Sequence, residues 1–95
     1  MKIIQNGMSI QCRTEDEYNM FFEVARREGY MWVGSHDIEP LHPFHSAQSF
    51  QIGYFNRNRV THGSIDEKYG KLVNVEASQL FYNLLKSRRV KHGTD

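Results

Sequence analysis

Residues 11–32 read QCRTEDEYNMFFEVARREGYMW, and this stretch decides the fold because it specifies a capped helix that leads directly into a strand. Thr14 and Glu17 have the spacing of a capping box, in which each side chain accepts a hydrogen bond from the backbone N–H of the other residue. Gly29 is suited to the left-handed conformation that ends a helix. Apolar residues recur at helical spacing between these points, at Tyr18, Phe21, Phe22 and Ala25. We therefore predict a helix over residues 14–28 and a strand over 30–34.

Short apolar or aromatic runs elsewhere predict further strands. Asn6-Gly7 tolerates positive φ and favours a hairpin between strands at 2–5 and 8–12. An aromatic strand at 49–55, turn residues at 56–58 and a returning strand at 59–62 follow a proline- and histidine-containing loop at 35–48. A last strand is expected at 71–75 and an apolar helix at 78–89. These elements predict an α+β fold, in which a small, mainly antiparallel sheet is packed by one central helix and followed by a C-terminal helix.

The composition is that of one small domain spanning residues 1–95. Of these residues 39% are hydrophobic, which is enough for a single core. Cys12 is the one cysteine in the sequence, so no internal disulfide can form, and this favours a reducing compartment. The first apolar runs are too short for a signal peptide, and no stretch approaches the roughly 18 apolar residues of a membrane span. We therefore expect a protein that works in the cytoplasm and not in a membrane.

The net charge of +1 conceals an uneven distribution. Residues 1–70 contain seven Lys and Arg against nine Asp and Glu, whereas residues 71–95 contain five against two. Most of the excess forms a basic C-terminal tail from about residue 86, with Lys86, Arg88, Arg89 and Lys91. Such a tail could contact phosphates or an acidic protein surface. It could equally be the basic end of a helix, where cations are favoured by the helix dipole, and we prefer this interpretation.

The order of the short motifs resembles a group of short, mostly uncharacterised proteins of bacteriophages and prophages. The matching positions are Cys12, residues 14–17, Gly29-Tyr30-Met31-Trp32, residues 52–55, Val60-Thr61-His62-Gly63, Tyr69-Gly70 and residues 72–75. The resemblance implies an origin in a phage or mobile element and an accessory role in the cytoplasm of a bacterial host. It brings no catalytic residues with it. The chain departs from the pattern in its longer C-terminal helix and basic tail, where a specific activity could reside.

Two patterns are candidates for chemistry at a metal or a thiol. His36, Asp37, His42 and His45 gather in the predicted loop, and His62 could approach from the next hairpin, but their spacing matches no standard zinc motif. Cys12 precedes a helix, which can lower a thiol pKa, although we expect a buried side chain there. No phosphate loop or nucleophile elbow occurs in the sequence. We predict no catalytic residues, no metal, no cofactor and no enzyme activity.

Aromatic and arginine residues on the predicted sheet suggest a nucleotide-binding or nucleic-acid-binding alternative. Stacking on aromatic rings next to phosphate-binding arginines is how single strands and small nucleotides are held. A protein of this kind could sequester a nucleotide signal. Alternatively, the same rings are core residues and the arginines face water, which we prefer because the chain has no basic stripe. The candidate residues are Trp32, Tyr54, Arg57, Arg59 and His62, with Phe55 beside them.

The preferred function is binding to a host macromolecule. The resemblance implies a stoichiometric accessory protein that inhibits or modulates a host protein, including defence effectors such as CRISPR nucleases. Aromatic and arginine side chains carry much of the binding energy of protein interfaces. The candidate partner-binding residues are Tyr30, Phe44, Phe55, Arg57, Tyr82, Arg88 and Arg89. A homodimer is a further alternative, because Tyr82 and Leu85 on the closing helix could be buried against a second copy.

Overall fold

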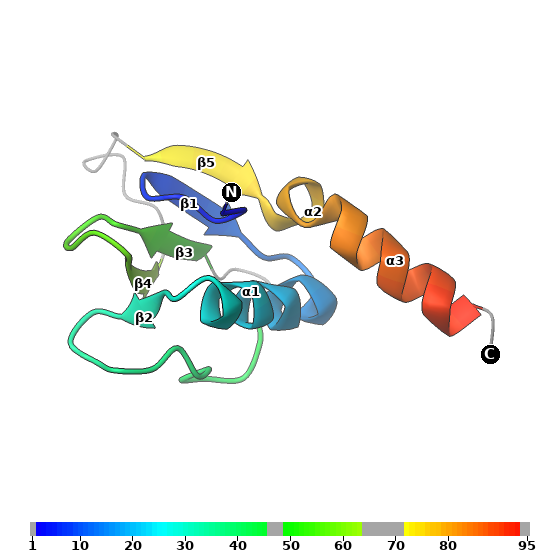
Figure 1. Cartoon of the computed structure of the whole chain (residues 1–95), viewed down its shortest axis with the longest axis horizontal. Helices are drawn as coiled ribbons and strands as arrows, with labels where there is room; N and C mark the ends of the chain where they lie inside the picture. The colour runs from blue at the N-terminus through cyan, green and yellow to red at the C-terminus, as the bar shows by residue number, and fades with distance from the viewer. Residues whose placement is uncertain (1, 46–48, 64–71, 94–95) are drawn as a thin grey trace.

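The computed structural model describes residues 2–45, 49–63 and 72–93, with side chains described as far as Arg88. Within these residues the chain forms five strands and three helices, in the order β1, α1, β2, β3, β4, β5, α2, α3 (Figure 1). The fold is α+β, as the sequence predicted. Lys71, the expected start of the last strand, and the side chain of Arg89 lie outside the described part of the chain.

Helix α1, Glu15–Arg27, begins and ends close to the predicted positions. Oγ1 of Thr14 accepts from the Glu17 N–H at 3.2 Å, which is the first bond of the expected capping box. The return bond is shifted by one residue, because the Glu17 carboxylate accepts from the Arg13 N–H at 3.0 Å and not from Thr14. Gly29 has a φ of 87°, as expected of a residue that ends a helix. The predicted strand at 30–34 is present as the short β2, Met31–Trp32.

The sheet has the strand order β2-β4-β3-β1-β5. Strand β3, Ser49–Ile52, is central and runs antiparallel to both β1, Met8–Gln11, and β4, Arg59–Gly63. The two outer pairs are parallel, with β5, Val73–Glu76, beside β1 and β2 beside β4. The sheet is therefore mixed, and the predicted antiparallel pairing is confined to its centre.

The predicted strand over residues 2–5 is wrong. Strands β3 and β5 occupy both sides of β1, so β1 has no edge left for a hairpin partner. The N-terminal segment instead runs past the end of α1, where the Glu28 carboxylate accepts from the backbone N–H groups of Ile3 and Ile4 at 2.8 and 2.9 Å. Gly7 does take the expected positive φ, 97°, but its turn connects this segment to β1 without forming a hairpin.

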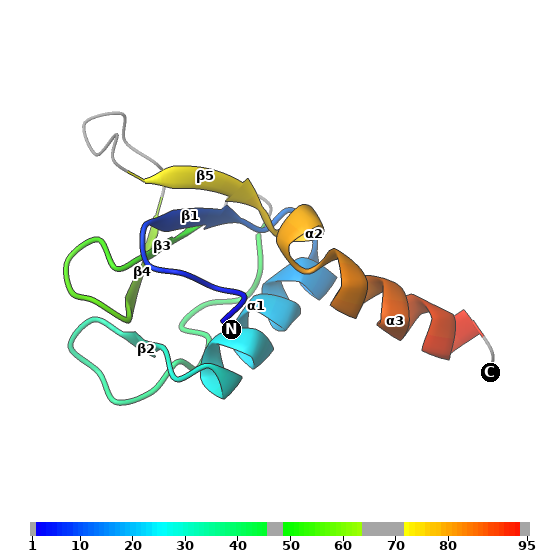
Figure 2. The ribbon, with the colours of Figure 1, turned by 45° about the horizontal axis from the view of Figure 1, so that its top comes forward.

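The predicted closing helix at 78–89 consists of two helices, α2, Ala77–Leu80, and α3, Tyr82–Gly93. Phe81 lies between them and is buried, as is Leu85 one turn later. Helical hydrogen bonds still bracket the junction, since the Phe81 N–H bonds to the Ala77 carbonyl and the Leu85 N–H to the Phe81 carbonyl, both at 2.9 Å. Beyond this anchor, α3 extends away from the sheet in both ribbon views (Figures 1 and 2).

The core lies between α1 and one face of the sheet. The Phe21 ring of α1 stacks on the Phe50 ring of β3, with centroids 4.2 Å apart and planes within 6°. Side chains alternate between the two faces of a strand, so Ile10, Phe50, Ile52 and Val60 share the buried face, whereas Ser9, Gln51 and Thr61 share the other face. The sheet is thus apolar toward α1 and polar on its opposite face, as is common when helices cover one side.

Candidate functional site

We call residues 53–58, which join β3 to β4, the hairpin tip. The predicted strand at 49–55 ends before this segment because the chain turns at Gly53, whose φ is 75°. The turn is closed by backbone bonds from the Gly53 N–H to the Arg59 carbonyl at 2.8 Å and from the Arg59 N–H to the Asn56 carbonyl at 3.1 Å. Asn58 takes a φ of 64°, which asparagine tolerates better than most residues.

Asn6 holds the hairpin tip from the N-terminal segment. Its Oδ1 accepts from the Asn58 backbone N–H at 2.6 Å, and its Nδ2 donates to the Asn58 Oδ1 at 2.9 Å. We call this pair of bonds the Asn6–Asn58 clamp. Gly53 allows the clamp to form, because a Cβ atom at this position would lie only 2.8 Å from the Cβ of Asn6. The hairpin tip is therefore connected at two points to a segment 52 residues away in the sequence.

Two of the predicted interaction residues are exposed on the hairpin tip. The Phe55 side chain is 65% exposed, and its ring meets the ring of the half-buried Tyr54 edge-on with centroids 4.6 Å apart. Arg57 is also exposed. A large apolar ring and a guanidinium thus lie two residues apart on a turn that the Asn6–Asn58 clamp holds in place.

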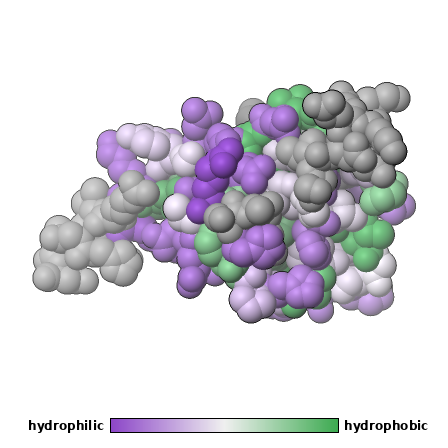
Figure 3. Space-filling model, turned by 180° about the vertical axis from the view of Figure 1, so that it is seen from behind, coloured by the Kyte–Doolittle hydropathy of each residue, from purple (hydrophilic) through white to green (hydrophobic). Residues whose placement is uncertain are grey.

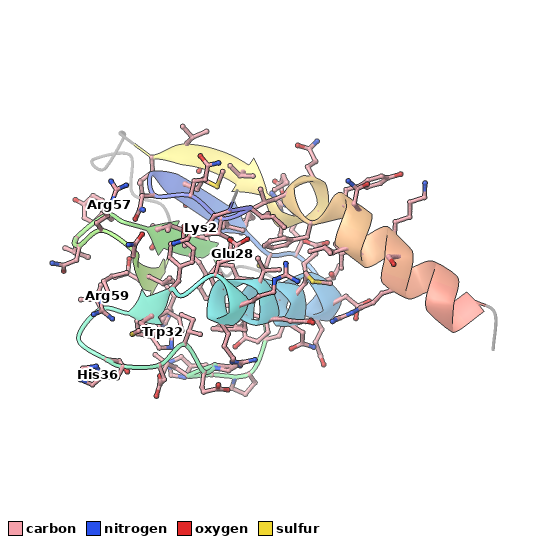
Figure 4. All side chains as sticks on the ribbon, viewed as in Figure 1. Lys2, Glu28, Trp32, His36, Arg57 and Arg59 are labelled. Atoms are coloured by element: carbon pink, nitrogen blue, oxygen red, sulfur yellow. The ribbon has the colours of Figure 1, made fainter. Side chains whose placement is uncertain are left out.

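A pocket of about 470 Å³ lies between the hairpin tip and the N-terminal segment, and we call it the N-terminal pocket. Its lining residues are Lys2, Ile4, Gln5, Asn6, Tyr30, Arg57 and Asn58. The Tyr30 hydroxyl donates to the Ile4 carbonyl, and the Lys2 ammonium lies 5.0 Å from the centroid of the Tyr30 ring. Burial raises the pKa of the Tyr30 phenol, the Glu28 carboxylate raises it further, and the Arg57 charge lowers it. Figure 4 shows Lys2 and Glu28 near the end of α1, with Arg57 on the hairpin tip.

The other predicted partner-binding residues do not form one surface. Tyr30 is only 2% exposed, so its prediction as an exposed contact residue is wrong. Phe44 was expected to have little contact with the core, but it is half-buried and its ring meets the Tyr18 ring at 5.6 Å. Arg88 forms an ion pair with Glu23 of α1. Tyr82 is 57% exposed, on α3. Arg89, the last of the set, lies outside the described side chains.

The predicted nucleotide-binding residues do not form one surface: the Trp32 and His62 rings meet with centroids 5.5 Å apart, whereas Tyr54 and Arg57 lie on the hairpin tip. Trp32 is buried, and its indole Nε1 donates to the Glu39 carbonyl at 2.7 Å, so its ring is not available as an exposed stacking surface. Arg59 donates to the Ser35 carbonyl at 3.0 Å and so connects β4 to the loop after β2. His62 is exposed next to Trp32. In Figure 4 Trp32 and Arg59 lie in the lower part of the view, whereas Arg57 lies above them with Lys2.

His62 does approach the histidine loop, as expected, with its ring centroid 5.4 Å from that of His42. Burial lowers the pKa of His62, and the charges of His42 and His45 lower it further. No group of three His, Cys, Asp or Glu side chains within residues 2–45, 49–63 and 72–88 could hold a metal ion.

Cys12 is fully buried, as the sequence led us to expect. Its Sγ donates to the Glu17 carbonyl at 3.7 Å. Burial raises the pKa of the thiol to about 12, with smaller contributions in the same direction from Glu17 and Glu76. The helix N-terminus therefore does not produce a thiolate at this position, and Cys12 packs as a small apolar side chain.

Sequence reasoning assigned no function to several residues in and around the N-terminal pocket, among them Lys2, Asn6 and Glu28. Asn6 gave a local signal, but the signal indicated a turn and not a clamp. Lys2 and Glu28 gave none, because their roles depend on how the N-terminal segment crosses the end of α1.

Comparison of the chain with protein-family models, curated proteins and solved structures finds no match. No helix in the described part of the chain is long and apolar enough to cross a membrane. Seen from behind, the molecular surface is largely hydrophilic, with smaller hydrophobic areas between (Figure 3).

Proposed function

We propose that this protein is a non-enzymatic binding protein of the bacterial cytoplasm that inhibits or modulates a host macromolecule. The contact is made by the hairpin tip, with Phe55 as the apolar contact and Arg57 as the charged one. One observation carries the proposal: Phe55 is 65% exposed beside Arg57 on a turn that is hydrogen-bonded to a distant segment. The resemblance to phage accessory proteins supports a host protein as the partner, including a defence effector such as a CRISPR nuclease.

An exposed aromatic ring on an ordered turn fits this role for two reasons. Aromatic and arginine residues dominate the energetics of interfaces when a partner removes them from water. In addition, a turn that is already ordered loses little conformational entropy on binding, which leaves more of the contact energy as affinity. The Asn6–Asn58 clamp supplies that order before any partner is present.

Tyr82 defines the competing surface on α3. It is 57% exposed, comparable with Phe55, and the Lys86 ammonium lies 5.8 Å from its ring centroid. A homodimer through α3 would bury Tyr82 and leave the hairpin tip free. The two surfaces therefore make opposite predictions for matched substitutions.

The test is affinity capture from a bacterial lysate with C-terminally tagged wild type, the double variant Phe55→Ser with Arg57→Ala, and Tyr82→Ser. We expect wild type and Tyr82→Ser to retain the same stoichiometric protein and the double variant to lose it. Thermal melts of all three proteins should be alike, because all the substituted side chains are exposed. Capture that is unchanged in the double variant but lost in Tyr82→Ser contradicts the proposal, as does a dimer that only Tyr82→Ser dissociates.

A further inference from the structure

The N-terminal pocket combines two cations with a rigid polar wall. Lys2 and Arg57, from segments far apart in the sequence, both line it, and the Asn6–Asn58 clamp joins the two segments that carry them. Its volume of about 470 Å³ is within the range of small-molecule sites. Tyr30 and Ile4 also line it, although each is almost fully buried.

The two cations of this pocket lack a direct counter-ion among the residues that the structure describes. Among the described residues, neither Lys2 nor Arg57 has a carboxylate within ion-pair distance. The Glu28 carboxylate acts on Tyr30, which lines the pocket, but both of its oxygens accept from the backbone N–H groups of Ile3 and Ile4. The Lys2 ammonium is held over the Tyr30 ring, a cation–π arrangement that limits its freedom. The pocket is therefore lined by two positive groups that form no ion pair within the described part of the chain.

The types of these groups indicate the kind of anion. A guanidinium offers paired N–H donors that match the oxygens of a phosphate, and an ammonium adds a compact positive charge. The amide groups of Asn58 and Gln5 lie in the same lining and can donate to further oxygens. In the Asn6–Asn58 clamp the Asn58 side chain uses its oxygen, so its Nδ2 is not consumed by the clamp.

We propose that the N-terminal pocket binds the phosphate group of a small phosphorylated molecule, with Lys2 and Arg57 as the two cationic ligands. This site differs from the set of residues that the sequence suggested for nucleotides, with which it shares Arg57 alone. It shares Arg57 with the macromolecular contact proposed above, but Phe55 does not line the pocket and Lys2 is not part of that contact. The two activities can therefore be tested with variants that affect one and not the other.

The test is calorimetric titration of the full chain, tagged at its C-terminus, with inorganic phosphate, adenosine monophosphate and glucose 6-phosphate at low ionic strength. The variant is Lys2→Gln. The matched control is Lys86→Gln, which removes the same charge from over another tyrosine ring, Tyr82, on α3. We expect at least one probe to bind, with affinity about tenfold weaker in Lys2→Gln and unchanged in Lys86→Gln. Binding of both organic phosphates would indicate recognition of the phosphate itself, and binding of the nucleotide alone would indicate an added contact to the base.

Three outcomes overturn the inference. The first is the absence of binding by all three probes. The second is equal weakening in Lys2→Gln and Lys86→Gln, which would indicate general charge attraction. The third is binding of a single-stranded oligonucleotide without binding of the mononucleotide, which would indicate a nucleic-acid surface. Phe55→Ser separates this inference from the proposed function, because it should lose the captured protein and keep the phosphate affinity.

Discussion

The two ends of the molecule are stabilised in different ways. Around the N-terminal segment, the Asn6–Asn58 clamp and the two bonds that Glu28 accepts from the Ile3 and Ile4 N–H groups join segments that are far apart in the sequence. At the other end, α3 is attached through the buried side chains of Phe81 and Leu85 and through the Arg88–Glu23 ion pair. Directional polar bonds fix the orientation of groups, whereas apolar burial supplies most of the free energy of folding. The comparison indicates that the hydrogen bonds fix the orientation of the hairpin tip, whereas apolar burial attaches α3 to the rest of the fold.

The same pair of residue types, a lysine and a tyrosine, occurs at both ends and illustrates the contrast. A lysine lies over a tyrosine ring at both ends, Lys2 over Tyr30 and Lys86 over Tyr82. Tyr30 is 2% exposed and its hydroxyl donates to a backbone carbonyl, whereas Tyr82 is 57% exposed. The surrounding structure, and not the pair itself, decides whether the lysine lines a pocket or lies on an open helix.

The largest expected effect is at the α3 end. Phe81→Ala removes a ring that is 1% exposed, and we expect it to lower the free energy of unfolding by about 3–5 kcal/mol. Tyr82→Ala, the adjacent exposed ring, should change it by less than about 0.5 kcal/mol. Urea denaturation of both variants measures the difference. Similar small losses in the two variants would show that apolar burial does not attach α3.

The next effect concerns the space that Gly53 leaves for Asn6. Gly53→Ala imposes a side chain on a φ of 75° and also brings it against Asn6, so we expect a loss of about 2–3 kcal/mol. Gly29→Ala is the control, because its φ is 87° but no atom lies within 4 Å of the added Cβ. It should lose about 1–2 kcal/mol. Thermal denaturation of the two variants should rank Gly53→Ala as the less stable, and the reverse order would contradict the close contact with Asn6.

A third comparison sets two glutamates of the α1 region against each other. Glu28→Ala leaves the Ile3 and Ile4 N–H groups without their acceptor, and we expect a loss of about 2 kcal/mol. Glu23→Ala removes an ion pair whose side chains are 44% and 49% exposed, and the loss should not exceed about 1 kcal/mol. Denaturant midpoints distinguish these values. Equal losses would mean that the N-terminal segment is not held by Glu28.

The smallest expected effect is a dependence on pH at the start of α1. Arg13 lowers the pKa of Glu76 below its ordinary value of 4.5, first by hydrogen bonding and then by its charge. Folding therefore favours the charged carboxylate. Its contribution to stability is present above pH 4.5 and is lost as the pH falls through the lowered pKa. Glu76→Gln should melt slightly below wild type at pH 7, and the difference should vanish in acid. A difference that grows as the pH falls would contradict this sign.

The sequence predicts best what depends on neighbouring residues. The Thr14 cap, the apolar face of α1 and the end at Gly29 involve residues a few positions apart, and the structure confirms them. The wrong strand at residues 2–5 has the opposite cause. Residues 2–5 do not form a strand because β3 and β5 already pair with the two edges of β1, and these strands are distant in the sequence.

The candidate site shows the same limit. Trp32 and Phe55 are both aromatic residues near a turn, yet one is 5% and the other 65% exposed. Local sequence does not distinguish them, because the difference arises from which rings α1 and the loop after β2 cover. The contribution of Asn6 and Lys2 is likewise visible only when the N-terminal segment is placed against the hairpin tip.

The central claim is that Asn6 holds the hairpin tip in a fixed conformation before any partner binds. Amide hydrogen exchange at Asn58, measured by NMR in wild type and in Asn6→Ala, tests this most directly, because the Asn58 N–H donates to the Asn6 side chain. We predict a protected Asn58 amide in wild type that loses its protection in Asn6→Ala, while the amides of β1 and β3 remain protected. An Asn58 amide that exchanges in wild type as fast as in an unfolded chain would contradict the claim.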